Sequence, residues 1–433
     1  MSKPKLAVIG ASHFQLPLIE KARDKGCEVH AFAWECGDVG ESAADVFHPV
    51  SIVDVDRIVG ECGRMGVDGV CTIASDLATV AVCHVADALG LVGNSLECMH
   101  ASTDKGAMRR AFDAGGDPSP RSLTIGLMED DATRGRVPAD VPVDLMLAKD
   151  DLDHLDPLEH GLRYPLIVKP ADRSGSRGVT KLEAPGVPIT VGGALRDALE
   201  QGFARRAVVE EFVEGDEFSV EGASWEGAHR VLAITRKGTT GAPHFIETAH
   251  LQPAGLAAGM AARIESVVAH ALDTLGVRYG ASHSELKVSP DGVVRLIEIG
   301  ARMGGDCIGS HLVPLSTGID YVGAVIDTAL GREPDLTPVS TPVAAAVRFL
   351  FDDADRRVLE RVRHERPDLI RYVHMTADAD ATGQVVSDSS TRLGHFVIAS
   401  PAVTELMPYL PAELVAALDV CDVQAAVDAA GGA

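Results

Sequence analysis

Strand-like and helix-like segments alternate strictly over the first hundred residues of the chain, which leaves few folds open to it. The strand patterns and the helical patterns between them lie at residues 5–10, 14–26, 27–34, 55–66, 67–74 and 76–90. Parallel strands need long crossover connections, usually helices, so this alternation is typical of a parallel α/β sheet. We expect residues 1–100 to form a Rossmann-like domain.

The ends of the first two strands raise the question of a dinucleotide site. Gly10 closes the first strand, and Glu35 follows the second, where an acid would bind a ribose. The segment that follows the first strand, GASHFQ, has one glycine where the dinucleotide fingerprint needs three. We therefore interpret this domain as a scaffold and not as an NAD site.

Composition and charge exclude several classes of partner. The chain has 433 residues and a formal net charge of −24, which disfavours nucleic acid and anionic membranes as partners. Its eight cysteines form no Cys-x-x-Cys pair, and the N-terminus lacks the pattern of a signal peptide. No apolar run approaches the roughly 18 residues of a membrane helix. We expect a reduced, cytoplasmic protein.

A glycine- and serine-rich loop follows a short apolar strand that ends at Lys169. Its sequence, RSGSRGV, begins at residue 173 and leads into another strand. Backbone N–H groups of such a loop can bind phosphate oxygens. It lacks the Gly-Lys-Ser/Thr ending and the following helix of a P-loop, so we expect a lid between antiparallel strands. A plain hairpin turn is the alternative. The phosphate-binding candidates are Ser174, Gly175, Ser176 and Gly178.

Acidic residues gather where the next strand ends. Glu210, Glu211 and Glu217 lie in the segment EEFVEGDEF. A carboxylate there could accept hydrogen bonds from an adenine amine or from ribose hydroxyls. The alternative is a solvated acidic turn.

A hairpin at residues 283–300 carries two acids that we predict to bind a metal ion. With residues 289–292 as its loop, Glu285 lies opposite Leu296, and Glu298 lies diagonally across on the same face. His283 then faces Glu298. Two such carboxylates can ligate Mg²⁺ and leave its other positions for phosphate oxygens and water. A loop of three residues would instead place the acids on opposite faces, and neutralised surface acids are the alternative interpretation.

Taken in order, these motifs resemble the ATP-grasp superfamily over roughly residues 100–330. The resemblance implies an α/β ATP-grasp fold with a Rossmann-like N-terminal domain, a central lid subdomain and a C-terminal α+β domain with an antiparallel sheet. The corresponding boundaries are 1–100, 101–335 with the lid at about 164–213, and 336–433, where the last part completes the ligase core. Residues 126–150 lack periodicity, and we expect an inserted surface loop there.

The resemblance also implies roles for individual residues. Arg302 would hold the reacting phosphate, and Lys169 and His283 would assist it. The nucleotide would be bound by Lys105, Lys169, the lid loop, Glu210 at the adenine amine, Val213 at the base edge and Glu217 at the ribose, and Mg²⁺ by Glu285 and Glu298. Many members carry asparagine two residues after the second metal acid, where this chain has Gly300.

The segment from Glu298 to Gly331 is most similar to ligases that join two amino acids, or an amino acid and another amine. We therefore expect a carboxylate–amine ligase that uses ATP and two Mg²⁺ ions, with Mn²⁺ as an alternative, on small amino-acid substrates. Further substrate contacts would come from Arg236, His244 and Arg348, since arginine binds carboxylates bidentately; surface ion pairs are the alternative for each. Homodimers are common in the resembled family. The competing functions are a carboxylase, an aminoacyl ligase acting on a carrier-protein thiol, and a non-catalytic nucleotide sensor.

Overall fold

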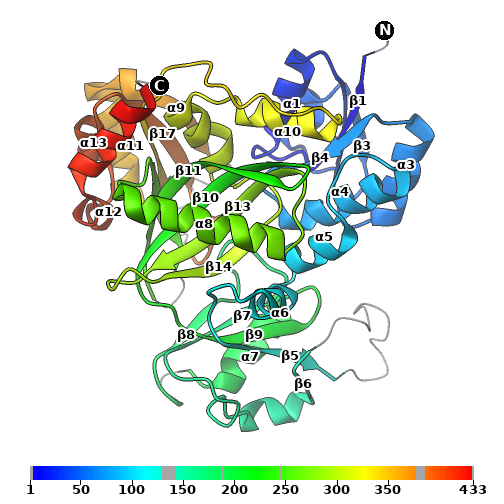
Figure 1. Cartoon of the computed structure of the whole chain (residues 1–433), viewed down its shortest axis with the longest axis vertical. Coiled ribbons are helices and arrows are strands. Elements are labelled where there is room, and N and C mark those ends of the chain that lie inside the picture. Colours follow the sequence, from blue (N-terminus) through cyan, green and yellow to red (C-terminus); the bar gives the residue numbers. More distant parts are fainter. Residues whose placement is uncertain (1–2, 129–142, 187–188, 243–244, 377–385, 432–433) are drawn as a thin grey trace.

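The computed structural model describes residues 3–128, 143–186, 189–242, 245–376 and 386–431, which form three β-sheets (Figure 1). The N-terminal sheet has the order β3-β2-β1-β4, and all of its strands are parallel. Its elements are β1 (Lys5–Ile9), α1 (Leu16–Asp24), β2 (Glu28–Ala33), α2 (Val39–Ala43), β3 (Val46–Pro49), α3 (Val55–Met65), β4 (Gly69–Cys71) and α4 (Asp76–Leu89). The predicted parallel α/β sheet is therefore confirmed.

The central part of the chain forms a five-stranded sheet of order β6-β5-β9-β7-β8, at the bottom of Figure 1. Its elements are β5 (Ser122–Leu127), β6 (Leu145–Leu147), η1 (Lys149–His154), β7 (Leu166–Pro170), β8 (Thr180–Leu182), α7 (Val191–Gln201) and β9 (Arg206–Glu211), preceded by α5 (Leu96–Thr103) and α6 (Lys105–Gly115). The surface loop expected at residues 126–150 is wrong toward both ends, because residues 126–127 belong to β5, residues 145–147 to β6 and residues 149–150 to η1. Residues 129–142 lie outside the described residues.

An eight-stranded antiparallel sheet forms the largest part of the molecule, in the order β14-β13-β10-β11-β12-β15-β17-β16. Its strands are β10 (Asp216–Trp225), β11 (Ala228–Thr239), β12 (Glu247–Gln252), β13 (Gly280–Val288), β14 (Val294–Gly300), β15 (Ala344–Leu350), β16 (Ile370–Met375) and β17 (Gly394–Ser400). The last three strands come from the C-terminal hundred residues, so this segment completes the same sheet.

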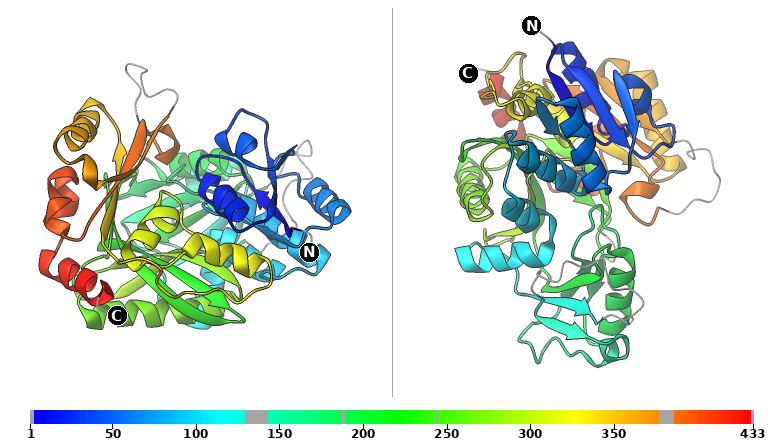
Figure 2. Two further views of the ribbon diagram at one scale, coloured as in Figure 1. Left: turned by 90° about the horizontal axis from the view of Figure 1, so that it is seen from above. Right: turned by 90° about the vertical axis from the view of Figure 1, so that its right-hand side faces the viewer.

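Helices cover the large sheet and join it to the N-terminal domain. Figure 2 shows α10 beside α1 of the N-terminal domain, and Ile19 and Ala22 of α1 share a buried cluster with Val322 and Ile326 of α10. The helical elements are α8 (Ala258–Thr274), η2 (Ile308–Leu312), α9 (Val313–Thr317), α10 (Tyr321–Ala329), α11 (Asp353–Glu365), η3 (Pro367–Leu369), η4 (Ser389–Thr391), η5 (Val403–Glu405), η6 (Met407–Tyr409), α12 (Ala412–Ala416) and α13 (Val420–Gly431).

The hairpin of β13 and β14 has a different register from the predicted one. Val288 pairs with Val294, so the loop is one residue longer than expected, and an unbroken ladder would pair Glu285 with Ile297. A β-bulge after Leu296 inserts one extra residue into β14, and as a result Glu285 lies directly opposite Glu298. Both acids are therefore on one face, and His283 lies opposite Gly300.

Two coarser sequence predictions can be compared with the structure. All eight cysteines are free thiols, and six of them are buried. Within the described residues, no helix combines the length and the apolar character that crossing a bilayer requires.

Candidate functional site

A cavity of about 320 Å³ lies between the lid loop, one face of the large sheet and two loops of the N-terminal domain. Most residues predicted from the sequence to bind ligands line it. These are Lys105, Lys169, Ser174, Gly175, Ser176, Glu210, Val213, Glu217, His283, Glu285, Glu298 and Arg302. The cavity therefore joins motifs that are spread over two hundred residues of sequence.

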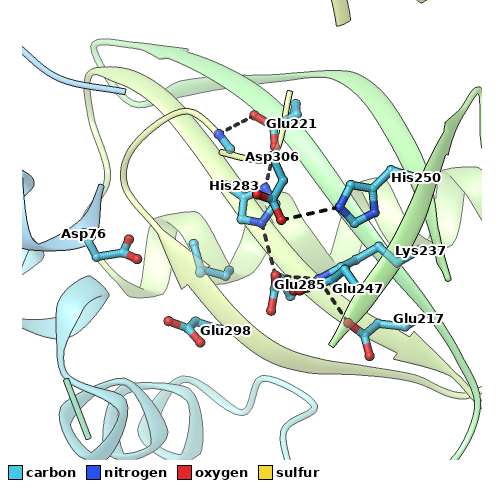
Figure 3. A network of polar contacts seen from close by, with 12 residues as sticks. Asp76, Glu217, Glu221, Lys237, Glu247, His250, His283, Glu285, Glu298 and Asp306 are labelled. Carbon is cyan, nitrogen blue, oxygen red and sulfur yellow. Dashed lines mark hydrogen bonds and ion pairs between the residues drawn. The ribbon is translucent and has the colours of Figure 1, made fainter. Parts of the chain in front are cut away.

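The two predicted metal acids lie side by side in the cavity (Figure 3). Each of them contacts a buried lysine. Lys237 Nζ donates to Glu285 Oε1 at 2.7 Å, and Lys105 Nζ donates to Glu298 Oε1 at 2.9 Å. Burial opposes the charge of Lys237, but Glu285, Glu217 and Glu247 hold its pKa well above the usual value. The two lysines balance the negative charges of Glu285 and Glu298 and leave the second oxygen of each carboxylate available to a metal ion.

This donor set fits a magnesium ion. Carboxylate oxygens are the ligands that Mg²⁺ prefers, and it is commonly bound through one or two of them together with phosphate oxygens and water. Within the described residues, no group of three or more His, Cys, Asp or Glu side chains could enclose a metal ion. Glu285 and Glu298 would therefore hold Mg²⁺ from one side, with the remaining ligands supplied by a bound phosphate compound.

Two buried cations flank a buried glutamate next to these acids. Lys169 Nζ donates to Glu210 Oε1, and Arg109 Nε donates to Glu210 Oε2 at 3.0 Å. Glu210 is only 3% exposed. Burial raises its pKa, but Arg109 and Lys169 outweigh this effect and leave the pKa of Glu210 below its usual value. The charged Glu210 carboxylate therefore holds the Lys169 ammonium in place at the cavity wall.

The lid loop joins β7 and β8, which pair antiparallel as predicted. Gly175, Ser176 and Gly178 all have left-handed backbone conformations, which bend the loop over the cavity. Ser176 Oγ donates to the Phe245 carbonyl at 3.2 Å, and Ser389 N–H donates to the Gly175 carbonyl at 3.4 Å. The loop thus contacts two other parts of the cavity rim.

Aromatic rings border the end of the cavity near β9 and β10. Phe212 and Phe245 lie with their ring centroids 5.6 Å apart, and both line the cavity with Val213 and Glu217. Flat apolar surfaces beside a backbone edge suit a nucleotide base, which stacks on aromatic rings. Glu217 Oε1 lies 3.0 Å from Lys237 Nζ, so this end and the metal acids share one polar network.

His283 lines the cavity and is held between two acids (Figure 3). Its Nδ1 lies 2.5 Å from Glu221 Oε1, and its Nε2 lies 3.3 Å from Glu285 Oε1. Burial lowers the pKa of His283, but Glu221 and Glu285 outweigh it and raise the pKa to about 9. Glu221 also accepts a hydrogen bond from Gly304 N–H at 3.0 Å, which fixes the turn after Arg302.

Other predicted residues lie elsewhere. Among the described residues, Gly178, Glu211, Arg236 and Arg348 do not line the cavity. Arg236 pairs with Asp216, and Arg348 pairs with Asp355. His244 lies outside the described residues.

Sequence reasoning missed several residues of the cavity. Lys237, Glu247 and His250 come from β11 and β12, and Asp306 lies beyond them. Arg392 does not line the cavity, but it holds two of these acids from behind. Arg392 Nη2 donates to Glu247 Oε2 at 2.6 Å, and Arg392 Nη1 donates to Asp306 Oδ2 at 2.8 Å. Lys237 and Arg392 lie near strand ends, and this position was a signal that the sequence carries. Their partners could not be predicted, because they depend on long-range strand pairing.

We expect the protein to lose stability as the pH falls from about 6.5 toward 4. Burial is the main cause that lowers the pKa of His250 and of His395 from 6.5 to about 3. Between these values the unfolded chain binds protons that the folded chain does not, so acid favours unfolding. Each of these two histidines contributes a loss of about 2 kcal/mol at pH 5 relative to pH 7.5, and together they outweigh the smaller opposite contribution of His283, whose pKa is raised. Urea unfolding at both pH values measures it, and His395→Asn should flatten the dependence. Equal stability at both pH values would contradict this expectation.

Part of the chain matches a known domain family. Residues 162–310 match the ATP-grasp domain family. Over 331 aligned residues the chain is 25% identical to an alanine–anticapsin ligase of Bacillus subtilis, and the alignment covers 69% of this chain and 64% of that enzyme. The chain therefore spans less than two thirds of that relative's length.

Solved structures share the fold over nearly the whole chain. An L-amino acid ligase from Bacillus licheniformis has a TM-score of 0.72 at 23% identity and covers 96% of this chain and 98% of its own. A carboxyaminoimidazole ribonucleotide synthase from Aspergillus clavatus, complexed with ATP, has a TM-score of 0.69 at 14% identity and covers 99% of both chains. At these identities the similarity concerns the fold, and it confirms the predicted fold class.

Proposed function

Because this chain carries an ATP-grasp domain, we propose that it is an ATP-dependent ligase that joins an amino-acid carboxylate to an amine and releases ADP and phosphate. The observation that supports this activity best is the arrangement in one cavity of two paired carboxylates, two buried lysines and Arg302 beneath a glycine-rich lid. These are the groups that phosphoryl transfer requires, since its catalysis depends mainly on positioning and on neutralising charge.

The proposed reaction has two steps. A carboxylate oxygen of the first substrate attacks the γ-phosphorus of ATP, the bond to the β–γ bridging oxygen breaks, and ADP leaves with that electron pair. The amine nitrogen of the second substrate then attacks the acyl carbon, and phosphate leaves as its bond to that carbon breaks. The proton lost by the amine ends on the phosphate. The product is a dipeptide-like amide.

The groups that would bind ATP each have a place in this scheme. When bound, Mg²⁺ would neutralise and align the phosphate oxygens. Lys105 and Lys169 would bind the phosphate tail, and Arg302 would stabilise charge on the transferred group. The lid loop would exclude water, which would otherwise hydrolyse the activated carboxylate. Phe212, Phe245 and Val213 would hold the base, and Glu217 the ribose.

A second candidate function is the carboxylation of an amine with bicarbonate as the activated acid. The fold similarity to a carboxyaminoimidazole ribonucleotide synthase supports this alternative. The two functions share the phosphoryl-transfer step and differ in the carboxylate that enters the cavity. Bicarbonate dependence of ADP release distinguishes them.

We expect ADP and phosphate to form when the correct pair of amino acids is added to the protein with ATP and Mg²⁺. The experiment is a screen of ADP release over all pairs of amino acids, with parallel arms that contain bicarbonate or a carrier-protein thiol. Mass spectrometry of the product then identifies the new bond. Formation of AMP and pyrophosphate would contradict the proposal, because it indicates adenylation of the carboxylate.

A further inference from the structure

A carboxylate from the N-terminal domain holds Arg302 in a two-pronged ion pair. Arg302 Nε donates to Asp76 Oδ1 at 2.7 Å, and Arg302 Nη2 donates to Asp76 Oδ2 at 2.8 Å. The two side chains are only 12% and 17% exposed. Such pairing fixes the plane of a guanidinium as well as its position. Figure 3 shows Asp76 reaching from the N-terminal domain toward the strand that carries Glu298.

The conformation of the loop before α4 places this carboxylate next to Arg302. Ala74 has a left-handed backbone with φ of 60°, which is costly for a residue other than glycine. Its N–H donates to the Met303 carbonyl at 3.1 Å, so the loop is anchored on the turn that follows Arg302. Ser75 caps α4, and Asp76 is the first residue of that helix. The strained residue thus turns the chain so that Asp76 faces Arg302.

The room for Asp76 exists because residue 300 is a glycine. A Cβ atom on Gly300 would lie 2.9 Å from Asp76 Oδ1 and 3.4 Å from Arg302 Nε. The Asp76 carboxylate cannot easily retreat, since both of its oxygens are bound to Arg302. The side chain missing at residue 300 and the carboxylate arriving from the N-terminal domain therefore occupy one space. This accounts for the glycine at residue 300.

We propose that Asp76 is a positioning residue that aims Arg302 at the terminal phosphate of ATP, and that Gly300 is required to admit it. This inference rests on the proposed function. The N-terminal domain then contributes to the reaction centre, beyond serving as a scaffold. In the scheme above, Asp76 does not touch the substrate; it acts through Arg302 alone.

The first test is a double-mutant cycle of Asp76→Asn and Arg302→Lys, read by calorimetric binding of Mg²⁺–ATP and Mg²⁺–ADP. Arg302 would contact only the terminal phosphate, so each single variant should reduce the preference for ATP over ADP about tenfold and leave ADP binding unchanged. The double variant should show no further loss, because both changes remove the same contact. The turnover number should fall about 10- to 100-fold in Asp76→Asn, with little change in the KM for ATP.

The control is Asp355→Asn, which neutralises the partner of Arg348 in a similarly buried pair outside the cavity. It should bind both nucleotides like the wild-type protein. Unchanged ATP preference in Asp76→Asn, or losses that add in the double variant, would overturn the role of Asp76. If the wild-type protein bound neither nucleotide, the proposed function would fail and this inference would fall with it.

The second test uses the shared space at residue 300. Gly300→Ala should reduce the ATP preference in the wild-type background, because the new methyl group displaces the Asp76 carboxylate. In the Asp76→Ala background, Gly300→Ala should not reduce the ATP preference further, because the Asp76 carboxylate with which the methyl group clashes is absent. Equal losses in both backgrounds would show that residue 300 acts independently of Asp76. Thermal melting of each variant verifies that it is folded.

Discussion

Glu298→Gln is expected to reduce ADP formation about 100- to 1,000-fold while the protein stays folded. The amide keeps the shape of the side chain but removes the charge that faces the phosphate tail and Mg²⁺, and the loss of one strong electrostatic contact in a reaction centre typically has this size. Glu298 also pairs with Lys105, so the variant changes the position of both groups. Steady-state ADP release at saturating Mg²⁺ measures the effect.

The matched control for this change is Glu265→Gln, on the exposed face of α8. It removes the same charge from the chain at a site away from the cavity and should leave ADP release unchanged. Turnover of Glu298→Gln close to that of the wild-type protein would remove Glu298 from the proposed metal site. Circular dichroism establishes that both variants retain the fold.

Lys237→Met is expected to lower the free energy of unfolding by about 3–5 kcal/mol, which is the usual cost of removing one partner from a buried ionic group. The Lys237 side chain is only 2% exposed, and its Nζ lies 3.0 Å from Glu217, 3.7 Å from Glu247 and 2.7 Å from Glu285. Methionine fills the same space but leaves three acids facing one another without their shared cation. Urea unfolding at neutral pH measures the change.

Lys21→Met provides the comparison, because Lys21 forms an ion pair with Asp320 but is 37% exposed. An exposed pair of this kind contributes at most about 1 kcal/mol. Similar effects of the two substitutions would indicate that Lys237 does not organise the polar network. Partial recovery of the Lys237→Met variant by Mg²⁺ is expected as well, since a cation between Glu285 and Glu298 would compensate part of the lost charge.

The local patterns of the sequence predicted the fold well where a single segment determines its own structure. The alternation over the first hundred residues gave the parallel sheet, because each strand and helix there carries its own periodicity. The predicted register of the β13–β14 hairpin was wrong for a physical reason. Its loop is one residue longer than the turn signal indicated, and a bulge after Leu296 restores the alignment of Glu285 with Glu298. A bulge has no reliable signal in a single sequence.

The site was predictable only as far as its motifs are local. Lys169, Glu285 and Glu298 lie at strand ends or on a hairpin, where short patterns identify them. Lys237 was missed because its three partners come from β10, β12 and β13, whose pairing is known only from the folded sheet. Asp76 had a usable signal, since it follows β4 at the edge of a parallel sheet where ligands commonly bind.

The most direct test of the account is a crystal structure of the protein with Mg²⁺ and a non-hydrolysable ATP analogue. We expect a metal ion at about 2.1 Å from carboxylate oxygens of both Glu285 and Glu298, with phosphate oxygens completing its ligands. Arg302, still paired with Asp76, should contact the terminal phosphate beneath the lid loop. A nucleotide bound outside this cavity, or Glu285 and Glu298 still paired with their lysines and without a metal contact, would contradict the account.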